Sequence, residues 1–331
     1  MDLHALNRRL SEQLVAFAWD QWAQMGILAS AHRHSRWAQD PEALIVFTLE
    51  VARDEPRLFD ELLDWMLLNE SLLSVRRLRA MCIDEEDRAL VDGTLRWLAG
   101  QRPRARLAGG QATKASGILE SLFRTDIPFT HMSESFAAAG LARPPLQPSG
   151  KSRAPDSSLP INLAFRLRQI LGVGIRAEAV RILLGIGAPR VTAQVLARGS
   201  AYSKRNVHDA LAALSAAGVV SAVTVGGELR YDADREAWAA LLRVDPIELP
   251  AHRDWRELLA ALRKILRFTG QAELEELSDY LLSSRIRDLL EAIRPQLAYA
   301  GIPIRTASTP EGVGHDFEQV VERLLAALGS A

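Results

Sequence analysis

Residues 199–232 read GSAYSKRNVHDALAALSAAGVVSAVTVGGELRYD, and the fold predicted for the middle of the chain rests on them. Ser203 is placed to cap a helix that begins at Lys204, and a glycine ends that helix after Ala217. The segment that follows is rich in β-branched residues as far as two glycines, whose positive φ angles suit a tight hairpin. We therefore expect a capped helix followed directly by a β-hairpin.

The expected helix has an apolar side and a polar side. At ~100° per residue, its apolar residues share one face: Val207, Ala210, Leu211 and Leu214. The polar residues of its first turns cover the remaining surface: Lys204, Arg205, Asn206, His208 and Asp209. We expect the apolar face to dock the helix and the basic residues to point outward. Asp209 is placed to pair with Arg205 at i, i+4.

Two further helices are expected before this one. The segment 176–187 has helical apolar spacing, and Thr192 is a plausible N-cap for a helix that runs to about Arg198. Helix, helix, turn, capped helix and hairpin occur in this order within about 60 residues. The segment 176–240 thereby resembles the winged helix-turn-helix domain of bacterial transcription regulators of the general MarR-like and ArsR-like type. The resemblance covers about a fifth of the chain.

The resemblance implies a role for each polar residue. Those expected to face the DNA major groove are Lys204, Arg205, Asn206 and His208. Arg205 would read guanine through its fork, and Asn206 would pair with adenine. Those expected to contact phosphates are Thr192, Arg198, Ser200, Tyr202 and Ser203. Arg230 would be the only cation of the wing, which also carries Glu228.

The charge distribution favours a polyanion-binding surface in the middle of the chain. The whole chain has a net charge of −1, but residues 1–100 have −6, 101–160 have +4, 161–215 have +6 and the remainder has −5. A basic centre between acidic flanks is typical of a localised nucleic-acid footprint. The acidic flanks suit a protein partner.

The rest of the chain is expected to be helical, which makes the fold class mainly α. Pro41 and Pro56 suit helix starts, and 69–71 separates two further helices, of which the second includes SVRRLRAM (74–81). This acidic region has no wing, so we expect a helical core or interaction domain rather than a second helix-turn-helix. The expected organisation is a helical N-terminal domain (1–142), a linker (143–160), the winged helix-turn-helix (161–245) and a helical C-terminal region (246–331).

The C-terminal region leaves two alternatives open. Its first helix has apolar residues at i, i+3, i+4 and i+7 spacing: Trp255, Leu258, Leu259, Leu262, Ile265 and Leu266. Such a stripe forms either a dimer interface or a private core. A second helix follows, then a short strand over 301–308 and a last helix.

Signals for enzymatic chemistry are weak. GVGIRA (172–177) formally matches a dinucleotide-binding motif, but the expected element before it is a helix and not a strand. The pair His32 and His34 lacks a third metal ligand nearby and is expected to lie in a surface loop. Cys82, the only cysteine, is expected to be a small core residue, which fits a reducing compartment. We expect no catalytic site, no metal and no cofactor.

The sequence therefore predicts a cytoplasmic DNA-binding transcription regulator, a repressor that reads a palindromic operator in duplex DNA as a homodimer. No apolar signal core or membrane span is evident. The alternative is an antitoxin-like or complex-subunit protein whose winged domain binds a protein partner.

Overall fold

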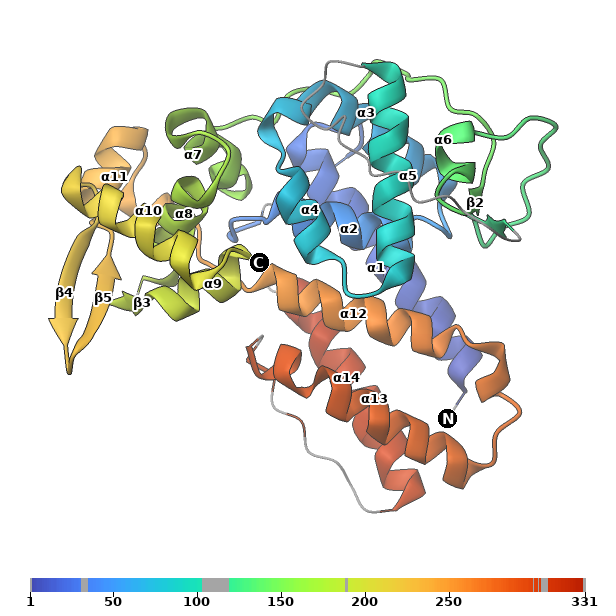
Figure 1. Cartoon of the computed structure of the whole chain (residues 1–331). Coiled ribbons are helices and arrows are strands. Elements are labelled where there is room, and N and C mark those ends of the chain that lie inside the picture. Colours follow the sequence, from blue (N-terminus) through green and yellow to red (C-terminus); the bar gives the residue numbers. More distant parts are fainter. Residues whose placement is uncertain are drawn as a thin grey trace.

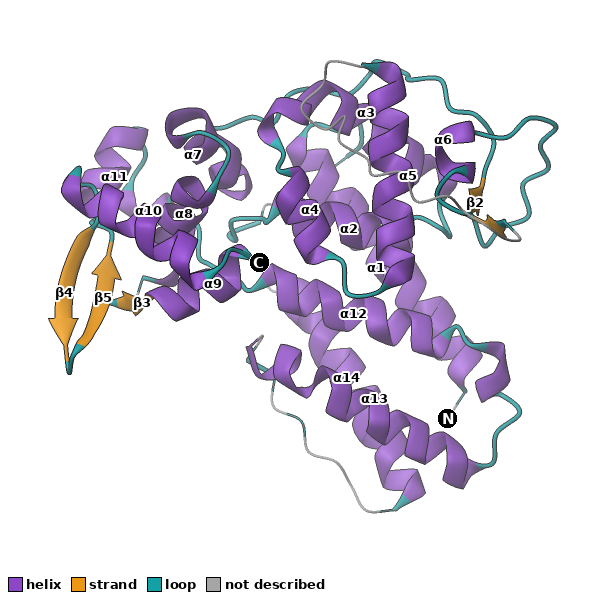
Figure 2. Cartoon of the chain, in the orientation of Figure 1, coloured by secondary structure: helices purple, strands orange, loops and turns teal. Residues whose placement is uncertain are grey.

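The chain is mainly helical, which confirms the predicted fold class (Figure 1; Figure 2). The computed structural model describes residues 2–30, 35–102, 119–187, 190–299, 301–302, 304 and 309–329. The His32/His34 motif lies outside these residues, as does most of the short strand expected over 301–308. Among the described residues, no helix combines the length and the apolar character needed to cross a membrane.

Most helices belong to one helical domain that is built from both ends of the chain. Its elements are α1 (Leu3–Met25), α2 (Pro41–Val51), α3 (Pro56–Asn69), α4 (Val75–Met81), α5 (Glu85–Gln101), β1 (Glu120–Ser121), α6 (Glu134–Ala137), β2 (Leu141–Ala142), α12 (Trp255–Thr269), α13 (Asp279–Tyr299) and α14 (Pro310–Gly329). The two short strands pair in parallel. Pro41 and Pro56 are the first residues of α2 and α3, as the sequence predicts, because proline fits the first turn of a helix.

The apolar stripe of α12 completes the core of this domain. All six of its residues named above are at most 2% exposed, and α12 packs against α1 and α2 of the same chain. Of the two alternatives, the private core is therefore the one observed. The stripe is not available as a dimer interface, because the N-terminal helices already cover it.

The chain between the two halves of the helical domain forms a smaller unit, which we call the central unit. Its elements are α7 (Leu163–Leu171), α8 (Ile175–Ile186), β3 (Val191–Thr192), α9 (Ala193–Ser200), α10 (Lys204–Ala216), β4 (Ser221–Val225), β5 (Glu228–Asp232) and α11 (Arg235–Leu242). It has a separate hydrophobic core. The strands form an antiparallel sheet in the order β3-β5-β4, so the hairpin is joined by a third strand that the sequence did not indicate.

The chain enters and leaves the central unit at neighbouring points. On entry, the Gln39 amide donates to the carbonyl oxygen of Ile161 at 3.1 Å. On exit, Ala251 exchanges backbone hydrogen bonds with Arg36 and Ala38, at 3.0 and 3.1 Å. The segment 36–39 of the helical domain thus holds both connections.

The segment 143–160, expected to be a linker, lies along the helical domain and is not a free tether. Arg143 is 1% exposed and its guanidinium lies over the rings of Phe59, Phe123 and Phe136, at 5.3–5.6 Å from their centroids. Farther along, the carboxylate of Asp64 accepts hydrogen bonds from backbone amides at 150 and 152. These contacts hold the segment against the helical domain despite its Pro- and Ser-rich composition.

Candidate nucleic-acid interface

Helix α10 presents a polar face that is largely exposed. Ser203 caps the helix, since its Oγ accepts from the Asn206 amide at 3.3 Å. The predicted burial of the apolar face is confirmed: Val207, Ala210, Leu211 and Leu214 are at most 6% exposed. The residues exposed on the other side are Lys204, Arg205, His208 and Asp209. Within the described chain, Asp209 does not pair with Arg205, so the expected i, i+4 ion pair is not formed.

Asn206, in the first turn of α10, and Tyr202, just before the helix, both contact the helical domain. The guanidinium of Arg76, from α4, lies 4.7 Å from the centroid of the Tyr202 ring. With its amide oriented to satisfy both partners, Asn206 donates to Ser203 Oγ at 3.1 Å and accepts from the terminal nitrogens of Arg76 at 2.9 and 3.2 Å. The amide oxygen of Asn206, which the expected pairing with adenine would use, thus already accepts from Arg76.

Ser200 does not lie on the surface where a phosphate contact was expected. It is fully buried, and its backbone carbonyl accepts from Nε of Arg77 at 3.0 Å. Helix α9 continues through this residue, one position beyond the glycine expected to end it, and its last turn packs against the helical domain. The predicted phosphate contact of Ser200 is therefore wrong.

Arg198 also faces the helical domain. Its Nε lies 3.6 Å from the carboxylate of Asp254, and its guanidinium lies 3.7 Å from the centroid of the Tyr299 ring. Both partners come from the C-terminal part of the chain. The Arg198 side chain thus connects α9 to α12 and α13, and it is not part of the polar face of α10.

Thr192 and Arg230 lie opposite one another in the sheet. Thr192 caps α9, accepting from the Val195 amide at 3.4 Å, and its backbone pairs with Arg230 of β5. Arg230, with 41% of its side chain exposed, lies 4.0 Å from Glu228. The hairpin β4–β5 turns at two glycines with φ of 59° and 81°, as the sequence predicts. Its exposed side chains are mostly uncharged, including Val223, Val225 and Leu229.

A buried network of ion pairs joins the central unit to the helical domain, and sequence reasoning missed it. Three carboxylates and three guanidiniums take part, all of them at most 3% exposed as side chains: Asp40, Glu42 and Arg77 from the helical domain, and Arg168, Glu178 and Arg181 from the central unit. Arg168 donates to both Glu42 and Glu178 at 2.6 Å. The surrounding guanidiniums outweigh burial and hold the pKa of Glu178 far below its ordinary value.

The sequence does contain one signal for this network. Charged residues at buried helix positions share the phase of the apolar ones: Arg168 follows Ala164 by four residues, and Glu178 precedes the buried Ile182 by four. The six charges balance, so the contact contains no uncompensated ion. The result is a fixed junction rather than a site with a free reactive group.

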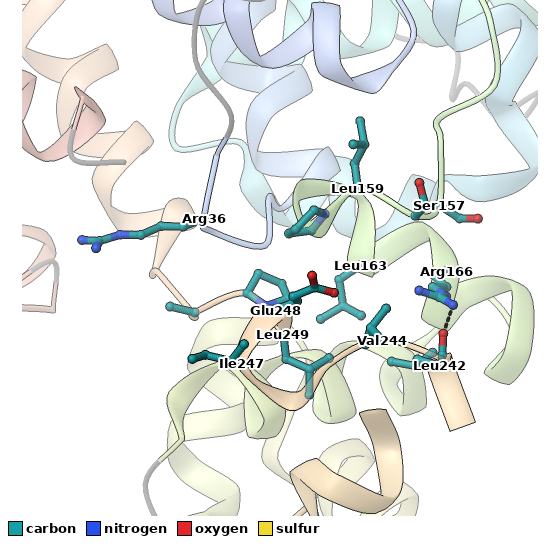
Figure 3. Close-up of a pocket in the computed structure, with 14 residues that line it drawn as sticks. Arg36, Ser157, Leu159, Leu163, Arg166, Leu242, Val244, Ile247, Glu248 and Leu249 are labelled. Carbon is teal, nitrogen blue, oxygen red and sulfur yellow. Dashed lines mark hydrogen bonds between the residues drawn. The ribbon is translucent and has the colours of Figure 1, made fainter. Parts of the chain in front are cut away.

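A cavity of about 460 Å³ opens at the same junction, on the side of the two chain connections (Figure 3). Its walls come from 157–166 on entry and 242–251 on exit, and most of its lining is apolar, including Leu159, Leu163 and Val244. Arg166 closes one end by donating to the backbone carbonyl of Leu242 (Figure 3). The cavity thus belongs to the junction between the units and is separate from the polar face of α10.

The remaining candidate motifs show no arrangement for chemistry. Burial raises the pKa of the Cys82 thiol to about 12, which disfavours the reactive thiolate. The GVGIRA motif follows helix α7, as expected, and not a strand. Among the described residues, no group of three His, Cys, Asp or Glu is placed to hold a metal ion. Comparisons with protein-family models, with curated proteins and with solved structures find no match to this chain.

Proposed function

We propose that the protein is a DNA-binding transcription regulator and that its central unit acts as a winged helix-turn-helix. The order α8, α9, α10 and the hairpin supports this, together with the pairing of β3 to β5. In such a unit the third helix enters the major groove with its first turns, and the hairpin lies beside it as the wing. Helix α10 and the hairpin β4–β5 would take these two roles.

The observation that carries the proposal is the exposed basic beginning of α10. Lys204, Arg205 and His208 extend from a helix that is fixed to the core on its other side, and within the described chain none of the three has an ion-pair partner. Arg205 has the donor geometry to read guanine, whereas Lys204 suits a phosphate. The amides at the start of the helix add a further attraction for phosphate.

Repression of a palindromic operator by a homodimer remains part of the proposal. Because α12 is covered, the dimer would use another surface. Helix α13 offers one, since Tyr280 and Leu281 are 71% and 51% exposed. Two copies related by a two-fold axis would place their α10 helices in successive turns of the major groove.

The direct test replaces both Lys204 and Arg205 with alanine in the full chain. Fragments of the host genome that bind the wild-type protein are selected first, and their affinity is then measured for both proteins. We expect the double variant to lose specific binding while its unfolding curve stays unchanged, because both side chains are exposed. Equal operator binding by the variant would overturn the assignment.

A protein partner is the second candidate function, and the hairpin favours it. Strand β4 is an edge strand in which all five residues are exposed and none is charged, so its backbone is open to pairing with another chain. The only cation of the hairpin lies near Glu228, which reduces its attraction for phosphate. Co-purification of one stoichiometric protein, with no DNA binding at physiological salt, would favour this alternative.

A further inference from the structure

Helix α4 of the helical domain lies next to the turn that leads into α10. Its residues Arg76 and Arg79 are exposed, one helical turn apart, whereas Arg77 between them is buried. In Figure 1, the hairpin, α10, α9 and α4 follow one another across the molecule. Helix α4 thus lies on the side of α10 away from the hairpin (Figure 1).

Arg76 is in direct contact with the candidate interface. One face of its guanidinium lies over the Tyr202 ring at 4.7 Å, and its terminal nitrogens donate to Asn206. Arg76 is exposed, and a guanidinium carries five N–H donors in a rigid fork, so the contact with Asn206 uses only part of its donor capacity. The ring and the amide therefore hold a cation in a defined orientation at the beginning of the proposed recognition helix.

The position of α4 relative to α10 is fixed by the neighbouring residue. Arg77 pairs with Asp40 and Glu42 of its own domain and approaches Glu178 of the central unit at 3.4 Å. It also donates to the Ser200 carbonyl at the end of α9. Because Arg77 and Arg76 are adjacent, the network that joins the two units also places Arg76 beside α10.

We propose that Arg76 is a DNA-contacting residue, so that the helical domain and the central unit bind one continuous stretch of duplex DNA. This inference rests on the proposed function. The partner is the phosphodiester backbone, since a fixed guanidinium beside a helix that enters the groove suits a phosphate and not a base edge. Arg79, whose terminal nitrogen lies 4.0 Å from Asp92, is partly neutralised and makes a smaller contribution.

The test measures binding of the full chain to a fluorescein-labelled duplex of mixed sequence, by anisotropy, over a series of KCl concentrations. Each phosphate contact contributes about 0.9 to the slope of log K against log salt. We expect Arg76→Ala to reduce the slope by about 0.9 and Arg76→Lys to keep it, because lysine retains the charge and loses only the fork. Arg294→Ala is the matched control, since Arg294 is an exposed arginine of α13 that pairs with Glu291 within its own helix.

The outcomes separate this inference from the proposed function. If the Lys204/Arg205 double variant loses binding while Arg76→Ala keeps the wild-type slope, the inference is wrong and the proposed function stands. If Arg76 only positions Tyr202 and Asn206, both Arg76→Lys and Arg76→Ala will lose affinity while keeping the wild-type slope. That result would also overturn the inference that Arg76 contacts DNA. A wild-type chain that binds no duplex at low salt overturns both.

Discussion

The side chain of Arg77 donates a hydrogen bond from Nε to the backbone carbonyl oxygen of Ser200, 3.0 Å away and 123 residues later in the chain. The donor belongs to α4 of the helical domain and the acceptor to the last turn of α9. The hydrogen bond therefore fixes the helix that precedes α10 directly to the N-terminal half of the protein. The central unit is a positioned part of the whole molecule and not an independent module.

We expect Arg77→Met to destabilise the folded chain by about 3–5 kcal/mol, because it leaves Asp40, Glu42 and Glu178 with one buried cation fewer. Urea unfolding followed by tryptophan fluorescence measures the change. Arg79→Met is the matched control in the same helix; it removes an exposed arginine whose ion pair with Asp92 lies at the surface, and should change stability by less than about 1 kcal/mol. Equal effects of the two substitutions would contradict the role of the network.

The same glycine-to-alanine change should have opposite effects in two helices. At Gly185, in α8, a Cβ atom would lie 2.6 Å from the backbone nitrogen and 2.9 Å from the Cα of His252, so we expect a loss of about 1–3 kcal/mol. At Gly100, in α5, no atom of the described residues outside the helix's own backbone lies within 4 Å of the added Cβ, and alanine should stabilise by about 0.5–1 kcal/mol. Thermal unfolding of the two variants checks both signs. A stable Gly185→Ala variant would show that this close approach of the exit connection to α8 is wrong.

His252 makes stability depend on pH. Its Nδ1 is buried and has no hydrogen-bond partner in the described part of the chain, and burial lowers the pKa of the imidazole from 6.5 to about 3. Below pH 6.5 the unfolded chain binds a proton that the folded chain does not. The contribution of the neutral imidazole to the free energy of unfolding is therefore complete above pH 6.5 and is lost as the pH falls toward 3. Between pH 7 and 4.5 we expect His252→Gln to lose about 2–3 kcal/mol less stability than the wild type.

The neighbouring Asp254 has the opposite effect on how stability changes with pH. Burial raises the pKa of this carboxyl from 3.8 to about 6, so the folded chain binds the extra proton and stability falls as the pH rises through this range. Asp254→Asn removes that opposing contribution and should make the loss of stability on acidification steeper than in the wild type. Urea unfolding at a series of pH values distinguishes the two variants, and parallel curves for both would exclude these shifts.

A substitution at Asp209 tests whether the polar face of α10 binds DNA. It is exposed and unpaired with Arg205, so Asp209→Asn removes a negative charge without removing a structural contact. If this face meets DNA, affinity for a mixed-sequence duplex should rise by about twofold to fivefold at low salt and the unfolding midpoint should not move. The exposed acid Asp288 of α13 provides the control through Asp288→Asn. No difference between the two variants would place DNA elsewhere.

Local features of the central unit could be predicted from the sequence because they depend on neighbouring residues. The cap at Ser203 and the apolar phase of Val207 and Leu211 fix which side of α10 is buried, whatever the rest of the chain does. Strand β3 has two residues and no pattern of its own, since its pairing comes from β5, almost forty residues later. It could not be read from the sequence.

The contacts of Ser200 and Asn206 with the helical domain could not be predicted from the sequence. Both residues are of types that often contact phosphates or bases. In the structure both accept hydrogen bonds from arginines of α4, which lie more than 120 residues earlier in the chain. Likewise Glu42 and Arg168 meet across 126 residues. Charged residues are expected on the surface, so their burial becomes evident only when the two units are placed together.

The division of the helical domain between the two ends of the chain has a consequence during protein synthesis. Helices α1 to α5 leave the ribosome long before α12, whose apolar stripe completes their core. The central unit has its own core and all its residues are made in between, so it is able to fold first. The core formed by the N-terminal helices is completed only when the last part of the chain has been made. A nascent chain arrested before residue 255 would therefore have a folded central unit beside an exposed, incomplete helical domain, which is the state that a chaperone would meet.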